Sequence, residues 1–188
     1  MNNTFALLRG TALALLAGFA LAGCGGPPET PRAPEDQTAP AKPAERAGGP
    51  VVVGEVAQLE KRLAGAAGRV VVVNFWATWC PPCVAEMPEL ARSHKEYVPE
   101  KAAFVSVSLD DPATADDTVA RFHEQKSLPF DVLVLNERNP DALTDVLKTE
   151  LSGALPTTLV YDDTGRLTKT WERAITLDEL KHALEPLL

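Results

Sequence analysis

The sequence predicts an α/β fold for residues 50–188, in which a β-sheet is covered by helices on both of its faces. Runs of apolar, β-branched residues alternate along this region with segments whose apolar residues recur at helical spacing. The run Val70–Phe75 has the character of a central strand, because a strand buried on both faces needs apolar side chains on both sides. Strands that alternate with helices are typical of a sheet with a helical layer on each face.

The first half of this region contains two predicted strands and two predicted helices. Val51–Val53 is a short strand and Val70–Phe75 is the central one. Between them, a helix is predicted to stop at Gly68, because apolar residues recur at helical spacing before that glycine (Val56, Leu59, Leu63 and Ala66). A second helix opens at Cys80–Cys83, and its core-facing positions are Val84, Met87, Leu90, Ala91 and Tyr97.

Two more strands and two more helices are predicted in the next segment. Phe104–Ser108 and Val132–Leu135 have the composition of strands. The dipeptide Asp111-Pro112 is typical of a helix start, and the helix after it buries Ala115, Val119 and Phe122. Asn139-Pro140 opens the other helix, which buries Leu143, Val146 and Leu147.

The last part of the chain predicts a β-hairpin and a C-terminal helix. Thr157–Tyr161 and Leu167–Trp171 are the two strands of the hairpin, and Asp162–Gly165 forms its turn. Thr176 and Glu179 have the spacing of a capping box, in which each side chain binds a backbone N–H near the start of the helix. The apolar face of this helix is formed by Leu177, Leu180, Leu184 and Leu187.

The composition indicates one acidic domain with extensions. The 188 residues are 45% apolar, which is enough for the core of one domain of ordinary size. Asp and Glu outnumber Lys and Arg by 26 to 18, and the chain has no basic block interleaved with aromatic residues. We therefore expect no nucleic-acid partner, and we expect the protein to be a monomer.

Residues 1–23 have the pattern of a targeting segment. Arg9 supplies positive charge, and the apolar or small run Thr11–Ala22 is too short to span a bilayer, which needs about 20 residues. The tetrapeptide Leu21–Cys24 resembles the bacterial lipobox, so Cys24 is the predicted lipidation site and the protein is expected to be extracytoplasmic and lipid-anchored to a membrane. The alternative is an ordinary signal peptide or an uncleaved apolar helix in which Cys24 has no role.

Residues 24–49 are expected to be a disordered tether between the lipid and the domain. Residues 25–50 contain seven of the 16 prolines and no Val, Ile, Leu, Phe, Trp or Tyr. Such a segment cannot bury enough apolar surface to offset the entropy lost on ordering.

The chemistry is expected at Cys80-Pro81-Pro82-Cys83. A cysteine at the start of a helix has a lowered pKa, because unpaired N–H groups and the helix dipole stabilise its thiolate. Cys80 is therefore the predicted nucleophile, and Cys83 is placed to resolve a mixed disulfide formed on it. Two alternatives are half of a metal site, which would need further ligands from the scattered His94, His123 and His182, and a purely structural disulfide. We expect no metal and no cofactor other than the redox-active disulfide.

The stretch Val70–Leu90, VVVVNFWATWCPPCVAEMPEL, resembles the active-site segment of thioredoxin-like proteins of the TlpA/ResA type, and Phe104–Asp111 and Gly153–Val160 continue the resemblance. It implies a thioredoxin fold, with a central mixed sheet flanked by helices on both faces. It also implies that Pro156 is a cis-proline facing the disulfide, and that Trp79, Leu155 and Pro156 bind substrate. The alternatives are an ordinary trans turn proline and a tryptophan that serves packing.

Glu86 matches the acidic residue that follows the C-x-x-C motif in this family. The resemblance implies a carboxylate near the second thiol, which can exchange a proton with Cys83. The alternative is an acidic residue favoured in the first turn of a helix by the dipole alone. Asn74 departs from thioredoxin itself, where a buried acid precedes the Phe-Trp pair. A second departure is the helical pattern between Pro50 and Gly68, where the TlpA/ResA group usually has a hairpin.

Together these features predict a thiol-disulfide oxidoreductase that exchanges disulfides with extracytoplasmic proteins, in the reducing direction. The resemblance implies protein dithiols or disulfides as substrates, such as an apocytochrome c or a misoxidised protein, and a membrane thiol-disulfide protein as the electron donor. The alternative function is a copper-handling or chaperone-like binding module that uses the same cysteines.

Overall fold

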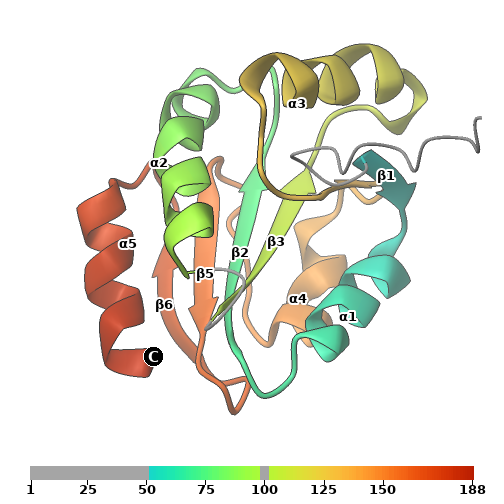
Figure 1. The fold of residues 1–188 in the computed structure, drawn as a ribbon. Helices are drawn as coiled ribbons and strands as arrows, with labels where there is room; N and C mark the ends of the chain where they lie inside the picture. Colours follow the sequence, from blue (N-terminus) through green and yellow to red (C-terminus); the bar gives the residue numbers. More distant parts are fainter. Residues whose placement is uncertain (1–50, 98–101) are drawn as a thin grey trace, which may run out of the picture. The chain divides into compact units, whose positions relative to one another are not determined.

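The computed structural model describes residues 51–97 and 102–188, which form one domain (Figure 1). The predicted signal peptide, Cys24 and the predicted tether lie outside the described residues. In the two described stretches, no helix is both long enough and apolar enough to cross a bilayer.

The centre of the domain is a mixed sheet of six strands. Their spatial order is β1-β4-β3-β2-β5-β6. The first four in this order run parallel to one another, whereas β5 is antiparallel to β2 and β6 is antiparallel to β5. The strand bounds are β1 Val51–Gly54, β2 Val70–Trp76, β3 Ala102–Ser108, β4 Val132–Leu135, β5 Thr157–Tyr161 and β6 Leu167–Trp171. Each strand that we predicted is present.

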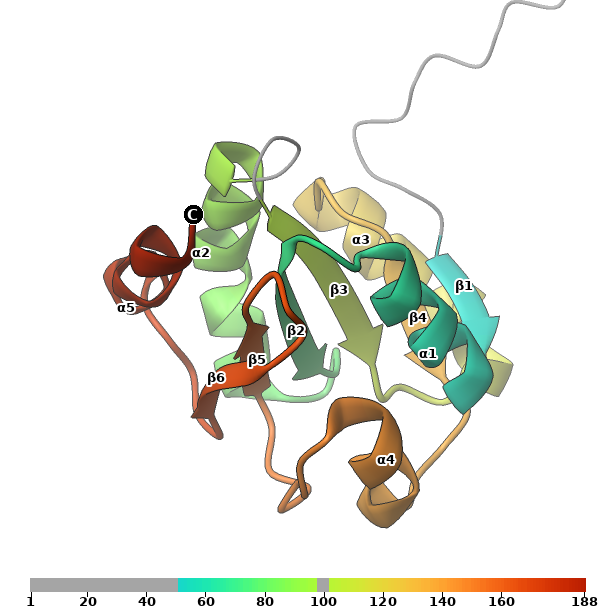
Figure 2. The same ribbon diagram turned by 90° about the horizontal axis from the view of Figure 1, so that it is seen from below.

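Helices cover both faces of the sheet (Figure 2). The core of one face includes both cysteines of the C-x-x-C motif and residues of α2 (Pro81–Tyr97) and α5 (Leu177–Leu184), and Phe122 of α3 (Arg121–Lys126) packs against it. The core of the other face includes residues of α1 (Val56–Gly65) and α4 (Thr144–Leu147). Side chains of β2 alternate between the two cores, because successive residues of a strand point to opposite faces. The predicted two-faced α/β architecture is therefore confirmed.

The helices after β3 and β4 differ in type from the prediction. The first consists of a 3₁₀ turn (Pro112–Thr114), a π-helical turn (Asp116–Ala120) and then α3. The amide of Ala120 bonds to the carbonyl of Ala115, five residues earlier. The second is a 3₁₀ turn (Pro140–Leu143) followed by the single turn of α4. Apolar spacing predicts which residues are buried, but it cannot distinguish three-, four- and five-residue hydrogen-bonding patterns in such short segments.

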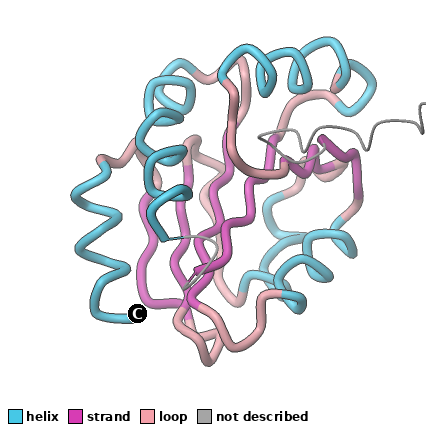
Figure 3. The backbone as a smooth tube through the Cα atoms, viewed as in Figure 1, coloured by secondary structure: helices cyan, strands magenta, loops and turns pink. Residues whose placement is uncertain are grey.

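The hairpin and the C-terminal helix form as predicted (Figure 3). Gly165 in the β5–β6 turn has a φ of 76°, a conformation that glycine adopts without steric cost. The side chain of Thr176 accepts from the Glu179 amide, and the Glu179 side chain accepts from the Thr176 amide, which completes the capping box of α5. A final 3₁₀ turn, Glu185–Leu187, ends the chain.

A row of polar side chains crosses the middle of this apolar sheet. Asn74 of β2 is paired in register with Ser106 of β3 on one side and with Thr158 of β5 on the other. All three residues are fully buried. Ser106 accepts a hydrogen bond from the indole N–H of Trp76, whereas Asn74 bonds to Thr158, as described below.

Candidate active site

The two cysteines of the C-x-x-C motif lie where β2 ends and α2 begins. The amide of Cys80 bonds to the carbonyl of Ala77, and the carbonyl of Cys80 accepts the first hydrogen bond of the helix from Val84. Pro81 stands at the first helical position, where its missing N–H costs nothing. The sequence therefore places Cys80 at the positive end of a helix of 17 residues.

Cys80 and Cys83 form a disulfide, with their Cα atoms 5.3 Å apart. The amide of Cys83 points at the Cys80 sulfur at 3.3 Å, so it can stabilise a thiolate there. Cys80 is 4% exposed and Cys83 is fully buried. Cys80 is thus the more exposed of the two, as a nucleophile needs to be, but in the disulfide form even Cys80 is largely covered. Beside it, Trp79 is 65% exposed.

Asp110 anchors the loop that leads to Cys80, a role that we did not predict. Its carboxylate accepts hydrogen bonds from both the amide (2.9 Å) and the hydroxyl of Thr78, and from the hydroxyl of Ser108 (2.7 Å). The guanidinium of Arg138 donates to the backbone carbonyls of Leu109 and Asp110. The sequence signal for such a role is an acidic residue two positions after the end of a predicted strand.

Glu86 lies one helical turn beyond Cys83 and is only 3% exposed. Its Oε1 accepts from the Asn74 side-chain amide, and its Oε2 accepts from the backbone amide of Ile175, each at 3.0 Å. Burial raises the pKa of Glu86 from 4.5 to about 7, although these two hydrogen bonds act in the opposite direction. The group can therefore gain or lose a proton near neutral pH.

Asn74 connects Glu86 to the polar row of the sheet. Its Nδ2 donates to Glu86 Oε1 and to the hydroxyl oxygen of Thr158, both at 3.0 Å. Its Oδ1 is buried and has no hydrogen-bond partner. The sequence showed Asn74 to be unusual, but it did not reveal the contact with Glu86.

Pro156 is preceded by a cis peptide bond, as the resemblance implied. It is buried at the start of β5, and Leu155 is partly buried and packs against the cores of both faces. A small cavity of about 90 Å³ lies beside Leu155, between the end of β2 and the turns before and after α4. Its lining includes Leu109, Arg138 and Leu151.

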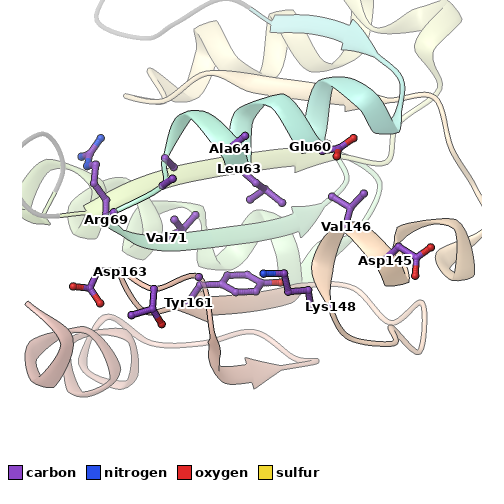
Figure 4. Close-up of a pocket in the computed structure, with 15 residues that line it drawn as sticks. Glu60, Leu63, Ala64, Arg69, Val71, Asp145, Val146, Lys148, Tyr161 and Asp163 are labelled. Carbon is purple, nitrogen blue, oxygen red and sulfur yellow. The ribbon is translucent and has the colours of Figure 1, made fainter.

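A larger cavity of about 380 Å³ lies elsewhere, among α1, α4 and the β5–β6 turn (Figure 4). Arg69, Val71, Lys148 and Tyr161 are among the residues that line it. Val71 is near the start of β2 and Cys80 follows its end, so this cavity and the disulfide lie at opposite ends of that strand. The predicted site residues are not part of this cavity.

The three histidines make contacts away from the cysteines. His94 packs against the rings of Phe104 and Phe130, and burial lowers its pKa. A ring nitrogen of His123 lies 2.8 Å from the Phe130 carbonyl, and one of His182 lies 2.7 Å from the Asp178 carbonyl. Within residues 51–97 and 102–188, no group of three or more His, Cys, Asp or Glu side chains is arranged to hold a metal ion.

Comparison with known proteins identifies similar sequences and structures. The model of the AhpC/TSA family matches residues 48–170. The thiol-disulfide oxidoreductase ResA of Geobacillus thermodenitrificans is 29% identical over 136 residues, which cover 72% of this chain and 73% of that protein. The thioredoxin-like protein YneN of Bacillus subtilis is 31% identical over 123 residues, 65% of this chain and 68% of that protein.

Among solved structures, the crystal structure of a DsbF homologue from Corynebacterium diphtheriae aligns with a TM-score of 0.58 at 25% identity. The alignment covers 66% of this chain and 76% of that one. A thiol:disulfide interchange protein of the thioredoxin family from Chlorobium tepidum aligns with a TM-score of 0.56 at 20% identity, covering 66% of this chain and 83% of that one. These structures show the thioredoxin fold.

Proposed function

Because this chain belongs to the AhpC/TSA family and is a thioredoxin-like thiol-disulfide oxidoreductase of the TlpA/ResA type, we propose that Cys80 and Cys83 are its redox pair and that it reduces disulfides of extracytoplasmic proteins. The observation that carries this proposal is the Cys80–Cys83 disulfide at the start of α2. It lies within the matched region, and Cys83 is one turn from a buried carboxyl group.

In the proposed reaction the reduced enzyme starts with both thiols free. The Cys80 thiolate attacks one sulfur of a substrate disulfide, so a Cys80–substrate disulfide forms and the other substrate sulfur leaves as a thiolate, which takes up a proton. Cys83 then loses its proton and attacks the Cys80 sulfur. The second substrate sulfur leaves and is protonated, and the Cys80–Cys83 disulfide forms. Two electrons have passed to the substrate, and a thiol protein of the membrane returns them by the same exchange.

Glu86 is the proposed base for the second attack. Cys83 is fully buried, so solvent cannot readily remove its proton. Glu86 lies one turn along the same helix and has a pKa of about 7, which suits a group that takes a proton and later returns it near neutral pH.

The proposed substrate-binding face consists of Trp79, Leu155 and Pro156. Trp79 is the most exposed large apolar side chain of the described residues, and it is adjacent to Cys80 in the chain. Leu155 packs against the core that contains both cysteines. The small cavity beside Leu155 can accept an apolar side chain of the bound segment.

The proposed location is the outer side of a bacterial membrane, with Cys24 lipidated and residues 24–49 acting as the tether. A Cys24→Ala variant should appear in the soluble fraction and keep its reductase activity after purification. If the variant stays entirely in the membrane fraction, Cys24 is not the anchor.

The redox assignment is tested by covalent trapping. Cys83→Ala should accumulate mixed disulfides with partner proteins, because the resolving thiol is absent. Cys80→Ala should trap few partners, since its remaining thiol is the fully buried one. The bands are compared on a non-reducing gel of cells that express each variant, and trapped proteins are identified after reduction. Equal trapping by both variants, or trapping only by Cys80→Ala, would contradict the proposed roles.

A further inference from the structure

Both oxygens of Glu86 face N–H donors, which is an arrangement suited to the charged carboxylate alone. Oε1 accepts from Asn74 and Oε2 accepts from Ile175. When Glu86 gains a proton, one of its oxygens becomes an O–H donor. Neither of the two present partners can accept that hydrogen, whichever oxygen carries it. The protonated form therefore needs one of the two partners to change.

The two partners differ in their ability to change. The Ile175 donor is a backbone amide, which cannot become an acceptor without moving the chain. The Asn74 amide can, because a half-turn about its last side-chain bond exchanges Oδ1 and Nδ2 at almost the same positions. In the present orientation Oδ1 is buried without a partner, so the half-turn gives up no hydrogen bond of that oxygen, and it moves Nδ2 from Glu86 and Thr158 to the site that Oδ1 leaves.

Thr158 can follow the same change. Its hydroxyl oxygen accepts from Asn74 Nδ2, and a hydroxyl group can donate as well as accept. After the half-turn, Oδ1 would accept from protonated Glu86 and from the Thr158 hydroxyl together. Thr158 is fully buried, so its hydroxyl group does not bond to solvent in either arrangement.

We propose that the Asn74 amide reverses by a half-turn each time Glu86 gains or loses a proton, and that Asn74 and Thr158 are positioning residues for proton transfer in disulfide exchange. The inference rests on the proposed role of Glu86 as the base. It assigns a function to the polar row of the sheet.

The charged groups around Glu86 have other partners. On α2, Glu89 pairs with Arg92 and accepts from the Leu177 amide. In the segment before α5, Arg173 pairs with Glu179. On β2 and β5 the facing side chains are the uncharged Asn74 and Thr158. No charged side chain is among the causes of the raised pKa of Glu86, so burial and the hydrogen bonds at its two oxygens control its proton affinity.

Thr158→Val distinguishes a reversing amide from a fixed one. With a reversing amide, the variant removes the acceptor of an Asn74 N–H only while Glu86 is charged, because in the protonated form it is Oδ1 that faces the missing hydroxyl, and Oδ1 still accepts from Glu86. The pKa of Glu86 should then rise by about 0.5 to 1, the equivalent of one buried hydrogen bond. With a fixed amide the same N–H is unpaired in both forms, and the pKa should not change.

The measurement is a ¹³C NMR titration of the Glu86 carboxyl carbon in the oxidised protein, in which the disulfide prevents both cysteines from titrating. Thr158→Ser keeps the hydroxyl and should keep the wild-type pKa. Ser106→Ala removes a buried hydroxyl from the same row, on the other side of Asn74, and should also keep it. Thr158→Ala replaces Thr158→Val if the latter does not fold.

The outcomes separate this inference from the proposed function. A raised pKa in Thr158→Val, with Thr158→Ser and Ser106→Ala unchanged, supports the reversing amide. An unchanged pKa in Thr158→Val overturns it. The pH profile of disulfide exchange by the same variants tests the role of Glu86 separately. If that profile does not follow the NMR pKa, the reversing amide stands and Glu86 is not the base.

Discussion

Two carboxyl groups of this domain have little exposed surface, but their pKa values are shifted in opposite directions. Glu86 is 3% exposed and has a pKa raised to about 7, whereas Asp162 in the β5–β6 turn is 7% exposed and has a pKa lowered to about 2. Glu86 accepts two hydrogen bonds from uncharged donors, which come from elements distant in the sequence. Asp162 accepts four from the two residues Thr164 and Arg166, and one of these comes from the Arg166 guanidinium.

The depth of burial and the number and charge of the donors therefore decide together which form of such a carboxyl group is stable. A tight turn supplies many donors close together, so it holds the carboxylate. Between α2 and the sheet, Glu86 has only two donors. The free-energy cost of burying its charge is therefore larger than the stabilisation by those two hydrogen bonds. Asp162 in the turn therefore keeps its negative charge, whereas Glu86 on α2 can exchange its proton near neutral pH.

The two groups give stability opposite dependences on pH. The folded pKa of Glu86 lies above its ordinary value of 4.5, so its contribution is fully present below pH 4.5 and is lost as the pH rises through about 7. The folded pKa of Asp162 lies below its ordinary value of 3.8, so its contribution is present above that pH and is lost as the pH falls through about 2.

The largest expected effect is that of Glu86→Gln, which removes the titration and keeps the size of the side chain. The difference between 4.5 and about 7 corresponds to about 3 kcal/mol in the free energy of unfolding. Between pH 4 and pH 8 the wild type should therefore lose about this amount relative to the variant. Urea denaturation at several pH values measures it.

Glu89→Gln is the matched control, since Glu89 lies on the same helix three residues further on and its side chain is more exposed. Its stability should follow the wild-type dependence on pH. Parallel curves for wild type and Glu86→Gln would mean that Glu86 has the same pKa in the folded and the unfolded protein.

Asp162→Asn should have the second-largest effect, on the acid side. At pH 7 the variant should have a lower urea midpoint, because an amide cannot accept all four hydrogen bonds of the turn. The difference should shrink as the pH falls from 3.8 toward 2, where the wild-type carboxylate also takes up a proton. Asp163→Asn, at the exposed neighbouring position, is the control. A difference of constant size from pH 7 to pH 2 would contradict the assignment of the low pKa to Asp162.

Thr164→Ala should have the smallest effect. It removes the hydroxyl that donates to Asp162 at 2.6 Å, and this contact is the largest cause of the lowered pKa. The pKa of Asp162 should rise from about 2 but remain below 3.8, because the backbone amides and Arg166 still donate. A ¹³C NMR titration of the Asp162 carboxyl carbon measures the change. No change would show that the other three donors are sufficient.

The sequence predicted features that depend on neighbouring residues. The strands, the hairpin turn and the capping box of α5 follow from periodicity and from residue types a few positions apart. The C-x-x-C motif at a helix start belongs to the same class, since four consecutive residues define it. In each case local geometry restricts the chain enough for a pattern to be specific.

Contacts between distant residues could not be predicted in this way. Ile175 is 89 positions from Glu86, and its donor is a backbone amide, which leaves no trace in the residue type. In the sequence, Glu86 therefore fitted both a role in proton transfer and the preference for acidic residues in the first turn of a helix. Its burial and its partners were needed to separate the two interpretations. Asp110 was missed for the same reason, because its contact with Thr78 spans 32 positions.

The bond from Ile175 to Glu86 makes the segment before α5 part of the proposed redox site. A protein shortened after Trp171 would keep both cysteines, all six strands and the cis-proline. It would lack the backbone donor to Glu86 Oε2 and the α5 residues Leu180 and Leu184 of the core that contains the disulfide. If Glu86 has the proposed role, the smallest functional unit of this domain extends beyond the last strand into the C-terminal helix.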